Sequence, residues 1–262
     1  MGAGLKGYHR YSDYARFPGG RKKIDYLMTA ISRLAAPGVE GKLRVLDVGC
    51  GNGSISFPLA SVGHQVIGVD IDEASVAYCR GHSSFNNASF QCVPDGRLPF
   101  KDSFDVVVCS EVLEHLAEPQ VLVNDMFNAL LRGGLLLITV PNGYGAREVL
   151  GRFEKFLRVR LRLDGLVRLL RRTAGMMSAE EKHAMHTSNP DQEHVQKFKW
   201  GRLRRTLEQS GLTVLEQVNS FVILSVFLRK GRIGELVERV DCRAADLLPA
   251  FMASGWYVAS RK

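Results

Sequence analysis

The chain has 262 residues, of which 45% are hydrophobic and 24% charged, a balance that excludes disordered and collagen-like chains. Its net charge of +8 is unevenly distributed, because residues 45–146 carry a net −7 whereas residues 1–44 and 147–172 carry +6 each. This division argues against a uniform nucleic-acid-binding coat and leaves a local anionic partner open.

No uninterrupted apolar run approaches the ~20 residues that span a bilayer, and the N-terminus lacks the apolar core of a secretion signal. The five cysteines are scattered and never spaced as Cys-x-x-Cys. We therefore expect reduced thiols in a cytoplasmic protein without a transmembrane segment.

The predicted elements begin with an N-terminal helical cap segment over residues 1–42, and one domain occupies residues 43–262. Short apolar runs ending in polar turns predict buried parallel strands at Leu43–Val48, Gln65–Val69, Phe104–Cys109 and Leu135–Val140. Helical patterns lie between them at Ser54–Ala60, Glu73–Arg80 and Pro119–Leu131. This alternation predicts βαβ units in an α/β sheet with helices on both faces and a ligand site at the carboxyl ends of the strands.

Further along, residues 147–172 form a long candidate helix rich in Leu and Arg, and residues 176–192 are predicted to be a polar loop. We expect a helix at Trp200–Gln209, a strand at Leu212–Gln217, mostly helix over Leu236–Met252 and a last edge strand at Trp256–Ala259. The apolar run Phe221–Leu228 fits either a strand or a buried helix.

A glycine-rich turn follows the first predicted strand, with glycines at positions 49, 51 and 53. The missing side chains let a backbone approach a ligand closely. Asp70 ends the second strand, where a carboxylate can accept the two hydroxyls of a ribose. The pair predicts a nucleoside-binding site.

The spacing of the glycines separates two classes of cofactor. Dinucleotide sites use G-x-G-x-x-G, which lets a helix N-terminus receive a pyrophosphate. Here the third glycine comes one residue early, and the charge of Asp47 would oppose a phosphate but suit a cationic ligand. The pattern favours a cationic or amino-bearing cofactor.

Four stretches, LDVGCGNG, GVDID, Pro94-Asp95-Gly96 and FDVVVCSEVLEHL, occur in the order of the motifs of class I S-adenosylmethionine-dependent methyltransferases, which residues 43–142 resemble. The resemblance implies a Rossmann-like, doubly wound, seven-stranded and mostly parallel sheet with a helical lid insertion at residues 146–190. It also implies S-adenosylmethionine as cofactor. The residues expected to bind it are Asp47, Gly49, Gly51, Asn52, Gly53, Asp70, Ile71, Asp95, Gly96 and Glu111.

Within that cofactor site, the resemblance gives the glycines to the methionine part, Asp70 to the ribose and Asp95 to the adenine amino group. Ile71 and Gly96 would flank the adenine, and Asp47 and Glu111 would lie near the sulfonium and the amino acid moiety.

The string Glu111-x-x-Glu114-His115 resembles two metal-using branches of the family, the ubiquinone-biosynthesis O-methyltransferases and the methyltransferases of the 3′-terminal 2′-hydroxyl of small RNAs. In a helical turn the two glutamates would face one side, so that they, His115 and His194 could hold Mg²⁺ and lower the pKa of a bound hydroxyl. In the alternative interpretation no metal binds, Glu111 touches the cofactor and Glu114 is structural. His115 or His194 then acts as a general base or packs as a structural histidine.

The basic segment 147–172 follows the fifth strand, where this fold usually builds its acceptor lid. It fits a lid helix with solvated arginines, an interfacial helix on anionic lipid, or an RNA-binding surface. RNA comes last because aromatic stacking residues are few. The string Val140-Pro141-Asn142-Gly143-Tyr144-Gly145, followed by His194-x-x-x-Phe198, resembles methyltransferases of glycan and lipid-linked saccharide biosynthesis.

Together these features predict an S-adenosylmethionine-dependent transferase that methylates an oxygen of a small-molecule, lipid-linked or saccharide acceptor. Its catalytic candidates are Glu111, His115 and His194. The alternatives are a metal-assisted RNA 2′-O-methyltransferase and a cofactor-binding protein without catalysis. The expected location is cytoplasmic, with peripheral contact at an anionic inner membrane face left open.

Overall fold

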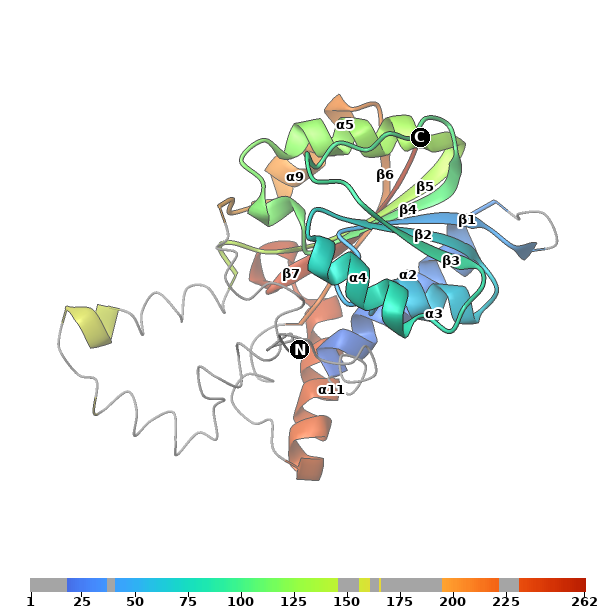
Figure 1. Ribbon diagram of the computed structural model, residues 1–262. Helices are drawn as coiled ribbons and strands as arrows, with labels where there is room; N and C mark the ends of the chain where they lie inside the picture. Colours follow the sequence, from blue (N-terminus) through green and yellow to red (C-terminus); the bar gives the residue numbers. More distant parts are fainter. Residues whose placement is uncertain (1–17, 37–40, 146–155, 161–164, 166–194, 222–230) are drawn as a thin grey trace.

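The computed structural model describes residues 18–36, 41–145, 156–160, 165, 195–221 and 231–262, in which helices and strands alternate (Figure 1). The strands are β1 (Arg44–Val48), β2 (Gln65–Asp70), β3 (Ala88–Cys92), β4 (Phe104–Ser110), β5 (Leu130–Pro141), β6 (Thr213–Asn219) and β7 (Gly255–Arg261). The α-helices are α2 (Pro18–Leu34), α3 (Ser56–Ser61), α4 (Glu73–His82), α5 (Pro119–Ala129), α9 (Trp200–Gln209) and α11 (Gly231–Leu247), and the short 3-10 helices are η2 (Leu113–His115) and η3 (Ala250–Met252).

The strands form one seven-stranded sheet in the order β3-β2-β1-β4-β5-β7-β6. β1 to β5 run parallel, and β7 runs antiparallel to both of its neighbours. The predicted doubly wound, mostly parallel sheet is therefore confirmed.

Two details of the sheet differ from the expectation. The strand around Trp256–Ala259 lies inside the sheet between β5 and β6, so its expected place at an edge was wrong. Its residues are almost entirely buried, which agrees with an inner position. The edge strand Ala88–Cys92 was not predicted, because its short and partly polar sequence lacks a clear apolar pattern.

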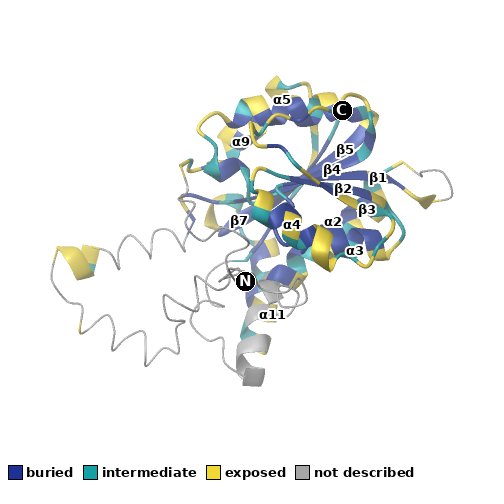
Figure 2. Ribbon diagram, viewed as in Figure 1, coloured by how far each residue is buried: buried dark blue, intermediate teal, exposed yellow. Residues whose placement is uncertain are grey.

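Helices cover both faces of the sheet, which explains why the central strands are apolar at successive positions (Figure 2). On one face, Val45 of β1 packs in a core with Leu27 of α2 and Leu59 of α3. On the other face, Leu46 packs in a core with Met126 of α5 and Leu203 of α9. The alternation along β1 thus joins two separate cores.

The order of the strands fixes where a ligand can bind. The chain passes outward from β1 to β2 and β3 and then returns to place β4 on the other side of β1. In such sheets ligands bind outside the carboxyl ends of the strands where the direction reverses, here between β1 and β4. The turns after β1 and β4 carry the glycine motif and Glu111.

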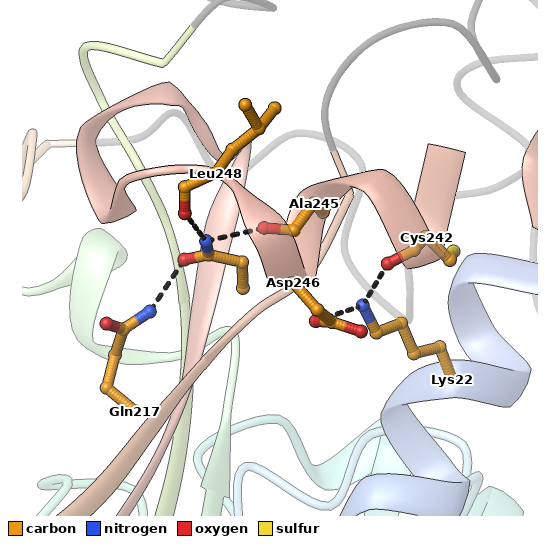
Figure 3. A network of polar contacts seen from close by, with 7 residues as sticks. Lys22, Gln217, Cys242, Ala245, Asp246 and Leu248 are labelled. Carbon is orange, nitrogen blue, oxygen red and sulfur yellow. Dashed lines mark hydrogen bonds and ion pairs between the residues drawn. The ribbon is translucent and has the colours of Figure 1, made fainter. Parts of the chain in front are cut away.

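Polar contacts join α2, α11 and β6 (Figure 3). The buried amide Nδ2 of Asn219 donates hydrogen bonds to the carbonyls of Ala245 at 2.7 Å and Leu248 at 2.8 Å. From α2, Lys22 Nζ donates to the carbonyl of Cys242 at 2.7 Å and pairs with Asp246 at 2.9 Å. The end of α11 is therefore held on β6 and against the N-terminal part of α2.

Most of the expected lid (146–190), the predicted loop 176–192 and the ambiguous run from residue 222 to 228 lie outside the described residues. The same holds for residues 1–17 of the N-terminal segment, whose residues 18–34 form α2. Among the helices that the structure describes, none combines the length and apolar character needed to cross a membrane.

Candidate functional site

The glycine turn after β1 has a backbone that only glycine adopts easily. Gly49, Gly51 and Gly53 have φ angles of +73°, +51° and +78°. A Cβ at Gly49 would lie 2.3 Å from Val112, and one at Gly53 would lie 2.4 Å from the ring of Phe57. At these two positions the protein's own packing excludes a side chain.

Asp70 joins this turn to the end of β2. Its carboxylate accepts the backbone N–H of Gly51 at 2.9 Å and that of Asp72 at 3.0 Å. Partial burial raises its pKa above the ordinary value, because a charged carboxylate loses hydration there. The structure thus places the predicted ribose-binding acid beside the predicted glycines, while Asn52 is buried in the same turn and accepts the N–H of Ser54.

Ile71 and Gly96 come together from different loops. Ile71 is 51% exposed, and a Cβ at Gly96 would lie 3.8 Å from its Cγ2. The neighbouring Asp95 is exposed and accepts the N–H of Arg97 at 3.1 Å. The guanidinium of Arg97 in turn binds both oxygens of Asp125, at 2.7 and 3.0 Å, which holds this loop against α5.

Asp47 lies behind the glycine turn and is 1% exposed. Its Oδ2 accepts the hydroxyl of Ser56 at 2.5 Å, and its Oδ1 has no hydrogen-bond partner among the described residues. Burial raises the pKa of Asp47 from 3.8 to about 6. An orphaned buried oxygen of this kind suits a site that receives a cationic or amino-bearing group.

Glu111 follows β4 with a φ of +56°, in the left-handed region. Its backbone N–H donates to the carbonyl of Thr139 at 2.9 Å, and its carboxylate accepts the Thr139 hydroxyl at 3.0 Å. Lys23 Nζ of α2 lies 3.2 Å from the same carboxylate, with a side chain only 10% exposed. The Glu111 carboxylate is therefore held from two elements that are distant in sequence.

The expected helical turn that would align Glu111 with Glu114 is not present. Glu111 is left-handed, and the following helical residues form the 3-10 turn η2. Glu114 is 1% exposed, and neither of its carboxylate oxygens has a hydrogen-bond partner among the described residues. Burial, followed by the charge of Glu111, raises the pKa of Glu114 well above its ordinary value.

His115 lies at the end of η2, with Nε2 3.9 Å from Glu114 Oε1 and a side chain 22% exposed. His194 lies outside the described residues, but the nearby Gln196 donates its backbone N–H to the carbonyl of Glu114 at 2.8 Å. The described part of the chain brings no three carboxylate, imidazole or thiol groups together as metal ligands. The described residues by themselves, which exclude His194, therefore do not supply the Mg²⁺ site that the sequence suggested.

Lys23 is the residue of this site that sequence reasoning missed. Its local surroundings, a run of basic residues at the start of an amphipathic helix, are typical of a solvated helix end. Only the near-complete burial of its side chain and the contact with Glu111 distinguish it. No signal in the neighbouring sequence identifies that partner.

The fold is that of a class I S-adenosylmethionine-dependent methyltransferase. A family model described as "Methyltransferase domain" matches residues 40–211, and the chain belongs to this family.

The curated relatives include two ubiquinone biosynthesis O-methyltransferases. The protein from Idiomarina loihiensis is 40% identical over 109 residues, which cover 40% of this chain and 44% of the relative. The protein from Xanthomonas campestris is 35% identical over 124 residues, covering 46% and 49%. The chain thus matches somewhat less than half the length of each.

Solved structures share the fold at low sequence identity. Magnesium protoporphyrin IX methyltransferase from Synechocystis, solved with bound SAH, is 16% identical with a TM-score of 0.58, covering 93% of this chain and 84% of that one. A cyclase is 18% identical with a TM-score of 0.55, covering 91% and 81%. Because proteins with such different names share this fold, the fold alone does not specify the reaction.

Proposed function

We propose that this chain transfers the methyl group of S-adenosylmethionine to an oxygen of a small-molecule, lipid-linked or saccharide acceptor. The observation that carries the proposal is the convergence of the glycine turn, Asp70 and the Ile71–Gly96 pair at the carboxyl ends of β1 and β2. Oxygen as the methylated atom is supported by the O-methyltransferase names of the curated relatives.

The cofactor supplies a methyl group on a cationic sulfonium, and the chain's residues bind and orient it. The carboxylate of Asp70, already fixed by Gly51 and Asp72, would accept the ribose hydroxyls. Ile71 and Gly96 would flank the adenine, and the carboxylate of Asp95 would accept a hydrogen bond from the adenine amino group. The turn from Gly49 to Gly53 would line the methionine part.

The carboxylates near this site suit the charge of the cofactor. Asp47 and Glu114 are buried without a full set of hydrogen bonds, and Glu111, whose charge acts on Glu114, follows β4. A nearby cation favours the ionised form of such groups and offsets part of the cost of burying them. The net −7 of residues 45–146 agrees with this assignment.

An acceptor hydroxyl must lose its proton when the methyl group arrives. Glu111 and His115 follow β4 at the carboxyl edge of the sheet, so we assign the general base to this pair, with His194 as a further candidate.

The acceptor side is proposed from sequence and relatives together. The +6 segment 147–172 and the string that resembles glycan and lipid-linked saccharide methyltransferases support an acceptor held near an anionic surface. A cytoplasmic enzyme at the inner membrane face fits both features. The names of the two curated relatives support a small-molecule acceptor over RNA.

Calorimetry with S-adenosylhomocysteine tests the cofactor assignment. We expect Asp70→Ala to weaken binding at least tenfold, because it removes a charged acceptor and releases the Gly51 N–H. Asp25→Ala, which removes an exposed carboxylate on α2, should leave the affinity unchanged. Equal affinities for Asp70→Ala and the unmodified chain would refute the assignment.

The acceptor is tested with methyl-labelled cofactor added to a cell extract that is then separated into lipid, saccharide and RNA fractions. Label in the lipid or saccharide fraction, or in a small molecule, supports the proposal. Label confined to RNA, or cofactor binding without any transfer, would overturn it.

A further inference from the structure

Asn142, directly after β5, joins three segments at the carboxyl edge of the sheet. It is 2% exposed, and its Nδ2 donates to the carbonyls of Phe251 at 3.0 Å and Ala253 at 2.8 Å. Its Oδ1 accepts the N–H of Tyr144 at 3.0 Å, and its backbone forms a parallel bridge with Phe198. The turns containing residues 142–145, 195–199 and 250–253 are therefore fixed together.

Large apolar side chains on these segments remain open to solvent. Phe251 is 70% exposed, Val195 61%, Tyr144 45% and Met252 38%. Several large apolar side chains that are exposed together on one surface are typical of an interaction site. Residues 142–145, 195–202 and 250–253 together form a surface that we call the Asn142 edge.

Exposed cations lie among these apolar groups. Lys199 Nζ is 4.7 Å from the centre of the Tyr144 ring, and Arg202 is 5.9 Å from that of Phe198. Lys197 is exposed as well and packs with its Cβ against Gly143. Residues 142–145, 195–202 and 250–253 contain no Asp or Glu, so the edge is purely basic in its own side chains.

We infer that the Asn142 edge is a docking surface for an anionic lipid bilayer. Aromatic and aliphatic side chains enter the headgroup layer, and lysines and arginines beside them are attracted to anionic lipids. The inference rests on the proposed function, because the edge lies at the same carboxyl ends where the acceptor must meet the cofactor. Docking there would present the site to an acceptor in the membrane.

The charge and the exposed apolar groups favour an anionic bilayer over a second copy of this chain as the partner of the Asn142 edge. A second copy of the chain would bring the same three cations against each other, which opposes association through this edge. The basic groups complement a surface of many negative charges, and the exposed apolar groups complement its acyl chains.

Cosedimentation of the full chain with vesicles tests the inference. The unmodified chain should bind phosphatidylcholine vesicles containing phosphatidylglycerol at least tenfold more tightly than pure phosphatidylcholine, and added salt should weaken that binding. Lys197→Gln with Lys199→Gln, and separately Phe251→Ser, should each reduce binding to the anionic vesicles about tenfold. The matched controls are Lys101→Gln with Arg132→Gln, and Val62→Ser. These variants change exposed residues near the amino ends of the parallel strands, and they should bind the anionic vesicles as the unmodified chain does.

Equal binding to both kinds of vesicle, or equal losses in the edge and control variants, would overturn the inference. So would a dimer that Phe251→Ser dissociates, or RNA binding that the lysine variants abolish while vesicle binding persists. Thermal unfolding and S-adenosylhomocysteine binding are measured on every variant. Cofactor binding without vesicle binding refutes the docking surface alone, whereas vesicle binding without cofactor binding refutes the proposed function.

Discussion

Gly53 and Gly63 both have left-handed backbones, with φ of +78° and +96°, but their surroundings differ. A Cβ at Gly53 would lie 2.4 Å from the buried Phe57 ring, whereas a Cβ at Gly63 would meet nothing within 4 Å. The two positions therefore separate backbone strain from loss of packing.

We expect Gly63→Ala to lower the free energy of unfolding by about 1 kcal/mol, the cost of a left-handed alanine. Gly53→Ala should cost about 3 kcal/mol because it must also displace the Phe57 ring, and it should weaken S-adenosylhomocysteine binding. Urea unfolding of both variants measures the difference. Equal losses would show that the packing against Phe57 contributes little.

The ion pair of Lys23 with Glu111 shows how a residue gains its role from its surroundings. Two buried or half-buried glutamates lie close together after β4, and Lys23 lowers the pKa that Glu114 would otherwise have. Holding Glu111 in a left-handed conformation requires several contacts, since an L-residue adopts it at a cost. Those contacts come from β5 and α2.

At the scale of elements, the end of α11 accepts hydrogen bonds from a side chain of β6, in addition to its contacts with Lys22 of α2. Asn219 is 6% exposed and satisfies two carbonyls near the end of this helix, while Gln217 donates one hydrogen bond to Asn219 at 2.7 Å (Figure 3). The last carbonyls of a helix lack partners within the helix, so a side-chain donor stabilises them.

Asn219→Ala should lower the free energy of unfolding by about 2 kcal/mol, because it removes the side-chain donor of the Leu248 carbonyl and one of the two donors of the Ala245 carbonyl. Gln217→Ala removes one hydrogen bond at a half-buried position and should cost about 0.5 kcal/mol. Urea unfolding gives both values, and hydrogen exchange should show faster exchange in the last turn of α11 only for Asn219→Ala. A larger loss for Gln217→Ala would contradict this account.

At the scale of the whole molecule, the acidic edge of the sheet makes stability depend on pH. Asp47 has a pKa of about 6 in the folded chain against 3.8 as its ordinary value. Between these values the folded state binds more protons than the unfolded state, so stability falls as pH rises. The cost is absent below about pH 4 and fully present above about pH 6.

Asp47→Asn removes this titration and should therefore stabilise the chain at pH 8 by about 2 kcal/mol relative to its effect at pH 4. Asp25→Asn, at an exposed position on α2, should show no such pH dependence. Urea unfolding at the two pH values compares them. A stabilisation by Asp47→Asn that is larger at pH 4 would contradict the assigned direction.

The sequence alone determined the mostly parallel sheet, the order of its main helices and the set of residues proposed to bind the cofactor. These features depend on local patterns: apolar runs of strand length, a glycine turn after one strand and an acid after the next. Asp70, Gly51 and the Ile71–Gly96 pair meet because the carboxyl ends of parallel strands share one edge.

Only the tertiary structure decided which distant groups meet. It placed β7 inside the sheet, gave Glu111 its left-handed backbone and its partner Lys23, and joined three turns at Asn142. A local pattern reports how a segment buries its apolar side chains, but the partner of a strand edge, a buried charge or an amide is set by packing across the chain.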